Sequence, residues 1–150
     1  MSMKPLLFQA GALTAVVEDA ERSFPFECCG FLFGLITPAH RHIEEILVVH
    51  NQVEANAARR FAIAPADYMR AERHALATGL TLLGIYHSHP SHPAVPSIHD
   101  LRVALPMFSY VIASVHAEGL VGLRSWQLNV DSIFSEEPIL NFIPTPWLHY

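Results

Sequence analysis

The spacing of hydrophobic residues along the chain predicts three helices. Apolar positions recur every three to four residues over 11–24 and stop before Pro25, which is typical of an amphipathic helix: Leu13, Val16, Val17, Ala20 and Phe24. A second helix is expected over 66–78, because Pro65 suits a first helical turn and Gly79 suits a C-terminal cap. Residues 98–105 predict a shorter third helix.

Short apolar runs between these helices predict strands. The run at 80–86 is almost continuously apolar, which favours a central strand buried on both faces. Glu44 and Glu45 favour an outer position for the strand that contains them. The other predicted strands are shorter apolar or β-branched segments, and the full set is 30–36, 43–50, 80–86, 110–115 and 119–129. Helices interspersed with strands predict a single α/β domain with a mixed sheet, whereas residues 131–150, with three prolines and Trp147, form a tail without an assigned structure.

Composition narrows the class of protein. The chain has 150 residues, 51% of them hydrophobic and 15% charged, so one folded domain is expected. The net charge is −5 and Arg59–Arg60 is the only adjacent basic pair, which argues against nucleic-acid binding. Cys28 and Cys29 are neighbours and cannot close a useful loop, so a reducing compartment, the cytoplasm, is expected. The apolar stretch 6–17 is interrupted by Gln9 and lacks a convincing cleavage site, and no run approaches the length of a membrane span, so neither secretion nor a membrane partner is expected.

Histidines are the unusual feature, since four of the ten lie within thirteen positions: His87, His89, His92 and His99. His87 and His89 are two residues apart at the end of the strand predicted over 80–86, so their side chains point to the same side and can converge on one ion. Pro90 is expected to end that strand, and a short loop can then return Asp100 as an oxygen ligand. Two histidines and one carboxylate leave the fourth tetrahedral position open, which is typical of a catalytic rather than a structural zinc ion.

Simpler interpretations of the same residues exist. Ser97 and Asp100 have the spacing of a helix capping box. A structural zinc site is another alternative, disfavoured because three protein ligands leave one position open. Cys28 or Cys29 as a nucleophile would instead make a cysteine hydrolase, although free cysteines at the start of an apolar strand are commonly packed. The zinc signature of nucleobase deaminases is absent. The histidines outside the His-x-His pair are expected to face solvent: His92, His99, His40, His42, His50, His74, His116 and His149.

These motifs resemble the JAMM, or MPN-plus, metalloprotease family, whose signature is a distant glutamate followed by His-x-His-Pro, Ser and Asp. The segment 25–34 looks like the family's glutamate segment, and 84–90 looks like its metal-binding strand. Residues 61–65 are similar to the start of the family's second helix, with Ala64 where an acidic residue is frequent. The resemblance extends over about residues 5 to 130.

The resemblance implies a JAB/MPN fold, which is cytidine-deaminase-like, with a curved mixed sheet flanked by helices in a domain over 1–130. It implies zinc held by His87, His89 and Asp100, with Glu27 as general acid/base and Ser97 as a donor to the oxyanion. The implied substrates are ubiquitin-like proteins cleaved after a Gly-Gly tail, and the short chain is similar to compact prokaryotic forms associated with sulfur-carrier proteins. The alternative is a non-catalytic interaction module on the same fold, disfavoured because such relatives usually lose ligands that this chain keeps. The oligomeric state does not follow from the sequence.

Overall fold

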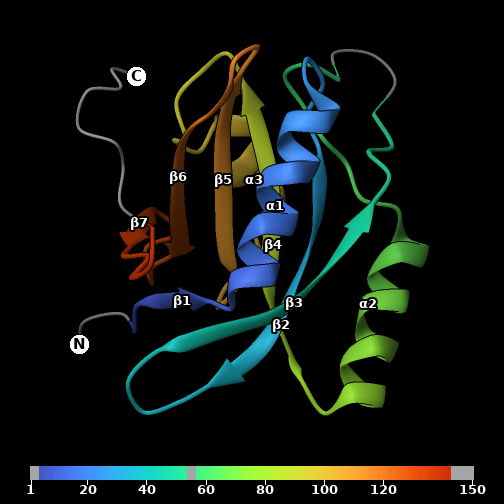
Figure 1. Cartoon of the computed structure of the whole chain (residues 1–150). Helices are drawn as coiled ribbons and strands as arrows, with labels where there is room; N and C mark the ends of the chain where they lie inside the picture. The colour runs from blue at the N-terminus through green and yellow to red at the C-terminus, as the bar shows by residue number, and fades with distance from the viewer. Residues whose placement is uncertain (1–3, 54–56, 143–150) are drawn as a thin grey trace.

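A curled, mixed seven-stranded sheet organises the chain, and three helices pack against it (Figure 1). The computed structural model describes residues 4–53 and 57–142. The strand order is β1-β3-β2-β4-β5-β6-β7. In chain order the elements are β1 (Leu6–Phe8), α1 (Ala10–Ser23), β2 (Cys29–Ile36), β3 (Arg41–Val49), α2 (Pro65–Thr78), β4 (Thr81–Pro90), α3 (Ile98–Val103), β5 (Ser109–His116), β6 (Gly119–Leu128) and β7 (Phe134–Glu137). The predicted single α/β domain with a curved mixed sheet is confirmed.

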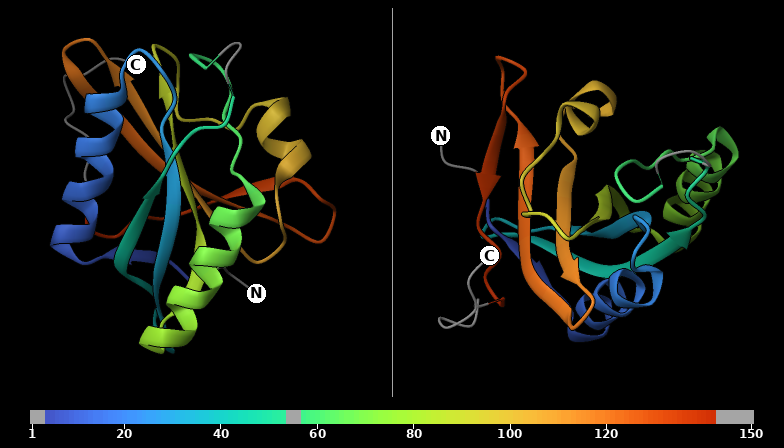
Figure 2. Two further views of the ribbon diagram at one scale, coloured as in Figure 1. Left: turned by 90° about the vertical axis from the view of Figure 1, so that its right-hand side faces the viewer. Right: turned by 90° about the horizontal axis from the view of Figure 1, so that it is seen from above.

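Each face of the sheet has its own apolar core. Alternate residues of β2 illustrate this, because Leu32 packs with α1 whereas Phe31 and Phe33 pack with the α2 residues Ala71 and Tyr68. Figure 2 shows α1 on one side of the curled sheet and α2 and α3 on the other. The central strand β4 is therefore covered on both faces, as its continuous apolar run predicts.

The two long helices form where the sequence predicts them. Gln9 caps α1, since its side-chain Oε1 accepts the N–H of Ala12 at 2.9 Å. Gly79 ends α2 in the left-handed region at φ +75°, a conformation that glycine adopts at little cost. The third helix ends at Val103, two residues earlier than predicted. Leu105 precedes Pro106, and the residue before a proline is pushed out of the helical region.

β4 is longer than the predicted strand. It continues through the histidines to Pro90, because β5 pairs with it in parallel as far as Pro90 and Val115. On the other side, the register with β2 ends at Cys29 and His87. Pro90 therefore ends the ladder, as expected from the sequence, with β5 paired along β4 as far as Pro90 and β2 paired only as far as His87. As a result His87 and His89 lie on a strand rather than on a loop.

Two short edge strands escaped prediction because three or four residues carry too little periodicity to be recognised. β1 pairs in parallel with only the first three residues of β3, so the remainder of β3 has no strand on that side in the described part of the chain. β7 lies within the tail left unassigned from the sequence and pairs antiparallel with β6. Trp147 lies outside the described residues.

Candidate metal centre and active site

His87 and His89 point to one side of β4, the side that α2 and α3 cover. Their rings are buried, and their Nε2 atoms are 3.2 Å apart. This follows from the two-residue repeat of a strand, because residues i and i+2 project from the same face.

Asp100, in the first turn of α3, brings its two carboxylate oxygens to these two nitrogens. Its Oδ1 lies 3.2 Å from Nε2 of His87, and its Oδ2 lies 3.1 Å from Nε2 of His89. In a tetrahedral site with metal bonds of about 2.0 to 2.1 Å, neighbouring ligand atoms are about 3.3 Å apart. The distances between these atoms are therefore close to those between the ligands of a zinc-sized cation.

Contacts behind the histidines orient both rings. Nδ1 of His89 lies 2.7 Å from the carbonyl oxygen of Pro93, which can only accept, so Nδ1 carries the hydrogen and Nε2 is left free for a cation. Phe61 stacks on His87, with ring centroids 4.4 Å apart. Nδ1 of His87 is buried without a hydrogen-bond partner among the described residues. The ring of His87 is thus held by packing and that of His89 by a hydrogen bond.

The electrostatics of the cluster favour the protonation states that a metal requires. Burial alone would raise the pKa of Asp100, but the charge of His87 and the hydrogen bonds from His87, His89 and the Ser97 backbone outweigh it and lower that pKa. Burial lowers the pKa of His87, against the opposing effect of Asp100. An ionised carboxylate and a neutral imidazole are the forms that bind metal.

Glu27 faces the same cluster from the turn before β2. It is 3% exposed, and its carboxylate and the ring nitrogens of His87 and His89 all lie within 4.8 Å of one another. Oε1 of Glu27 has no hydrogen-bond partner in the described part of the chain. Burial, followed by the charge of Asp100, raises the pKa of Glu27 to about 8. An unpaired buried carboxyl oxygen beside two histidines and a second carboxylate is suited to exchanging a proton with a water molecule held between them.

The segment that carries Glu27 is tied to a second loop by Asn51, a residue that the sequence analysis missed. Nδ2 of Asn51 donates to the carbonyls of Glu27 and Arg60 at 3.2 and 3.0 Å. Its Oδ1 accepts the N–H groups of Val53 and Ala62 at 3.1 and 3.0 Å. A lone Asn between a strand and a loop carries no sequence signal of this role, because its partners lie in separate segments.

Ser97 is the N-cap of α3 and forms the capping box expected from the sequence. Its Oγ accepts the N–H of Asp100 at 3.1 Å, and its own N–H donates to Oδ2 of Asp100 at 2.8 Å. No described residue accepts the hydroxyl hydrogen of Ser97. Ser97 also lines a pocket of about 600 Å³ beside the cluster, so its hydroxyl is placed to donate to a bound molecule.

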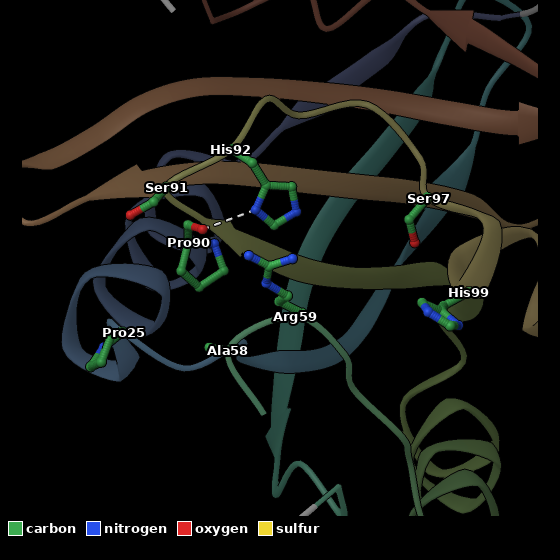
Figure 3. A pocket seen from close by; sticks show the side chains of 8 residues that line it. All are labelled: Pro25, Ala58, Arg59, Pro90, Ser91, His92, Ser97 and His99. Carbon is green, nitrogen blue, oxygen red and sulfur yellow. Dashed lines mark hydrogen bonds between the residues drawn. The ribbon is translucent and has the colours of Figure 1, made fainter. Parts of the chain in front are cut away.

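The pocket also collects residues that the sequence analysis assigned to solvent or to no role (Figure 3). Its lining comprises Pro25, Ala58, Arg59, Pro90, Ser91, His92, Ser97 and His99. The expectation of a solvent-facing His92 was wrong, because its ring is half-buried and stacks on that of His89 with centroids 4.1 Å apart. His99 is also half-buried, and its Nδ1 has no partner among the residues described.

The two cysteines do not resemble catalytic thiols. Both are buried, and burial raises the pKa of Cys29 to about 12 and that of Cys28 further. The thiolate is the nucleophile, and a raised pKa keeps both side chains in the thiol form at neutral pH, which disfavours the cysteine-hydrolase alternative.

Sequence comparisons find a matching family and named relatives of this chain. The family described as prokaryotic homologs of the JAB domain matches residues 9–129. The desampylase of Pyrococcus furiosus is 26% identical over 139 residues, covering 93% of this chain and 92% of the relative. The CysO-cysteine peptidase of Mycobacterium tuberculosis is 28% identical over 135 residues, covering 89% of each chain. A Thermus thermophilus protein named "Probable TtuB-protein conjugate cleaving protease" is 35% identical over 107 residues, covering 71% of this chain but 65% of that relative.

Solved structures extend the likeness to the whole fold. A solution structure from Desulfitobacterium hafniense has a TM-score of 0.79 and 26% identity, covering 97% of this chain and 99% of the other. A second, from Salinibacter ruber, has a TM-score of 0.67 and 33% identity, covering 99% and 95%. Together with the match over most of its length, these relationships show that the chain belongs to the family of prokaryotic homologs of the JAB domain.

Proposed function

We propose that this chain is a zinc metallopeptidase that hydrolyses the peptide or isopeptide bond after the C-terminal Gly-Gly tail of a ubiquitin-like, sulfur-carrier protein. The observation that carries the proposal is the cluster in which the two histidine Nε2 atoms lie 3.2 Å apart and each lies 3.1 to 3.2 Å from a carboxylate oxygen of Asp100, with the unpaired Oε1 of Glu27 beside it. The peptidase and protease names of the relatives support the same reaction class.

His87, His89 and Asp100 would hold the zinc ion through Nε2, Nε2 and a carboxylate oxygen. A zinc ion bound there supplies a Lewis acid that polarises the scissile carbonyl and lowers the pKa of water. Glu27 takes a proton from the attacking water and returns it to the leaving amine, a transfer for which a pKa near neutrality is suited. The Ser97 hydroxyl donates to the carbonyl oxygen as negative charge develops on it.

The proposed substrate follows from the relatives and from the shape of the sheet. The names of two relatives specify conjugates of CysO and TtuB. Beyond its first three residues, β3 has no strand on one side in the described part of the chain, and an extended tail can bind by adding backbone hydrogen bonds beside such an edge. No helix in the described ranges is long and apolar enough to cross a membrane. We place the reaction in the cytoplasm because both cysteines are free.

Incubation with defined conjugates tests this proposal. The purified protein is incubated separately with a CysO–cysteine conjugate and with a TtuB–protein conjugate. The masses of the products are measured by intact mass spectrometry. Cleavage after the ubiquitin-like tail is expected, together with its loss in chelator and its return on adding zinc. Binding without cleavage in the zinc-loaded protein would contradict the proposal and favour the interaction module.

A further inference from the structure

The loop that carries Arg59 is joined to the segment that carries Glu27 by one backbone hydrogen bond and by the side chain of Asn51. The N–H of Glu27 donates to the carbonyl of Ala57 at 2.7 Å, and Asn51 bridges the carbonyls of Glu27 and Arg60. Arg59 lies between these two anchor points. Because consecutive Cα atoms are only about 3.8 Å apart, its backbone position relative to Glu27 is closely set.

The Arg59 side chain enters the pocket beside the metal centre. Figure 3 shows its guanidinium group below the ring of His92 and next to Pro90, with the Ser97 hydroxyl on the far side of the same space. Arg59 makes no ion pair with an acidic residue in the described part of the chain, unlike Arg22, Arg70 and Arg124. The pocket therefore contains a guanidinium group that can donate two parallel hydrogen bonds to a carboxylate.

The chemistry of the proposed reaction limits where such a carboxylate can come from. The C-terminal carboxyl of the ubiquitin-like tail is consumed in the scissile amide, so the tail itself brings no anion at this point. If the leaving group is a single amino acid, its free α-carboxylate carbon lies about 2.5 Å from the scissile nitrogen. If the leaving group is a lysine side chain within a protein, its α-carboxyl is bound in the main chain and is uncharged.

Resting on the proposed function, we propose that Arg59 binds the free α-carboxylate of a single amino acid attached to the ubiquitin-like tail. The enzyme is then selective for tails extended by one residue over isopeptide conjugates. The pocket volume, about 600 Å³, lies in the usual range for small-molecule sites and accommodates one amino acid.

A matched pair of substrates isolates this contact. CysO extended by one alanine is prepared as the free acid and as the C-terminal amide, which differ only in the negative charge; alanine avoids a thiol that could bind zinc. Because a hydrogen bond to a charged group contributes about 1.5 to 3 kcal/mol, we expect kcat/KM for the acid to exceed that for the amide about 10- to 100-fold. In Arg59→Gln the two values should become equal, and in Arg59→Glu the preference should reverse. Arg60→Gln, which removes the neighbouring charge, should retain the wild-type preference.

Binding without turnover provides a second readout. Chelator-treated protein should bind the acid about tenfold or more tightly than the amide by calorimetry, and Arg59→Gln should abolish that difference. Equal handling of acid and amide by the wild type, or a preference that survives in Arg59→Gln, overturns the role of Arg59. If the zinc-loaded wild type cleaves neither substrate nor the TtuB conjugate, the proposed function itself fails. Zinc content and thermal midpoint, measured on every variant, identify any that are misfolded.

Discussion

Ser97 and Asp100 hydrogen-bond each other in both directions at the start of α3, and the same Oδ2 of Asp100 that accepts the Ser97 N–H lies 3.1 Å from Nε2 of His89. The helix cap therefore aims the carboxylate at the histidines. The capping-box and active-site interpretations of this motif, which compete at the level of sequence, are compatible in the structure.

Replacing Ser97 separates its two roles. We expect Ser97→Ala to lower the thermal unfolding free energy by about 1 kcal/mol through loss of the cap, and to lower turnover about 10- to 1000-fold through loss of the oxyanion donor. Zinc content should change little, because the Ser97 N–H still orients Asp100. A lower midpoint with unchanged kcat would remove Ser97 from the catalytic mechanism.

Metal content tests the ligand set. The purified protein should hold about one zinc per chain by elemental analysis, and His87→Ala or His89→Ala should lose most of it, because two remaining ligands rarely keep a site occupied. His116→Gln, at the end of β5, serves as a histidine control and should bind zinc normally. Full occupancy in both ligand variants is incompatible with the assignment.

Glu27→Gln distinguishes a proton carrier from a metal ligand. The amide keeps the size of the side chain but cannot take the proton of water, so peptidase activity should fall about 100-fold or more with zinc content near that of the wild type. Loss of zinc in this variant would make Glu27 a ligand, and unchanged kcat would exclude it from proton transfer.

The burial of Glu27 predicts a pH dependence of stability in the metal-free protein. Its pKa is raised from 4.5 to about 8, so the folded state favours the protonated form. As pH rises from about 4.5 to about 8, the carboxyl ionises in the unfolded chain first, and stability falls by up to about 1.4 kcal/mol per pH unit. The pKa of Asp100 is shifted in the opposite direction, so the ionised Asp100 stabilises the folded state above its ordinary pKa of 3.8. This contribution to stability is lost as pH falls below 3.8, outside the range over which Glu27 acts.

Urea unfolding of chelator-treated protein at pH 5 to 8 measures this effect. The unfolding free energy of Glu27→Gln should rise relative to that of the wild type as pH increases. Parallel curves for the two proteins would show that Glu27 is not protonated in the folded state.

Asn51 should matter for activity without touching the metal ligands. Asn51→Ala removes four hydrogen bonds that join the Glu27 segment to the loop carrying Arg60, so we expect a loss of about 1 to 3 kcal/mol of stability. Turnover should fall about tenfold or more, because a small displacement of Glu27 disturbs proton transfer.

Asn129→Ala provides the matched control, since Asn129 makes three similar hydrogen bonds in the loop between β6 and β7. This variant should lose stability but keep its turnover. Equal losses of turnover in the two variants would mean that Asn51 acts only through general stability.

The sequence by itself determined the features that depend on near neighbours. The two long helices follow from apolar spacing and the residues at their ends, and the pairing of His87 with His89 on one face follows from the two-residue repeat of a strand. The spacing from Ser97 to Asp100 likewise predicted the cap that forms.

Only the tertiary structure decided what surrounds these histidines. Glu27 lies sixty positions before His87, and it reaches the cluster because β2 pairs with β4 and because Asn51 holds its carbonyl. The stacking of His92 on His89 and the entry of Arg59 into the pocket also depend on segments that meet only after folding. The local periodicity of a sequence predicts which face a residue occupies within its own helix or strand. Strand pairing and loop contacts decide which of these faces meet. Such contacts join residues far apart in the chain, so they produce no periodic pattern in a single sequence.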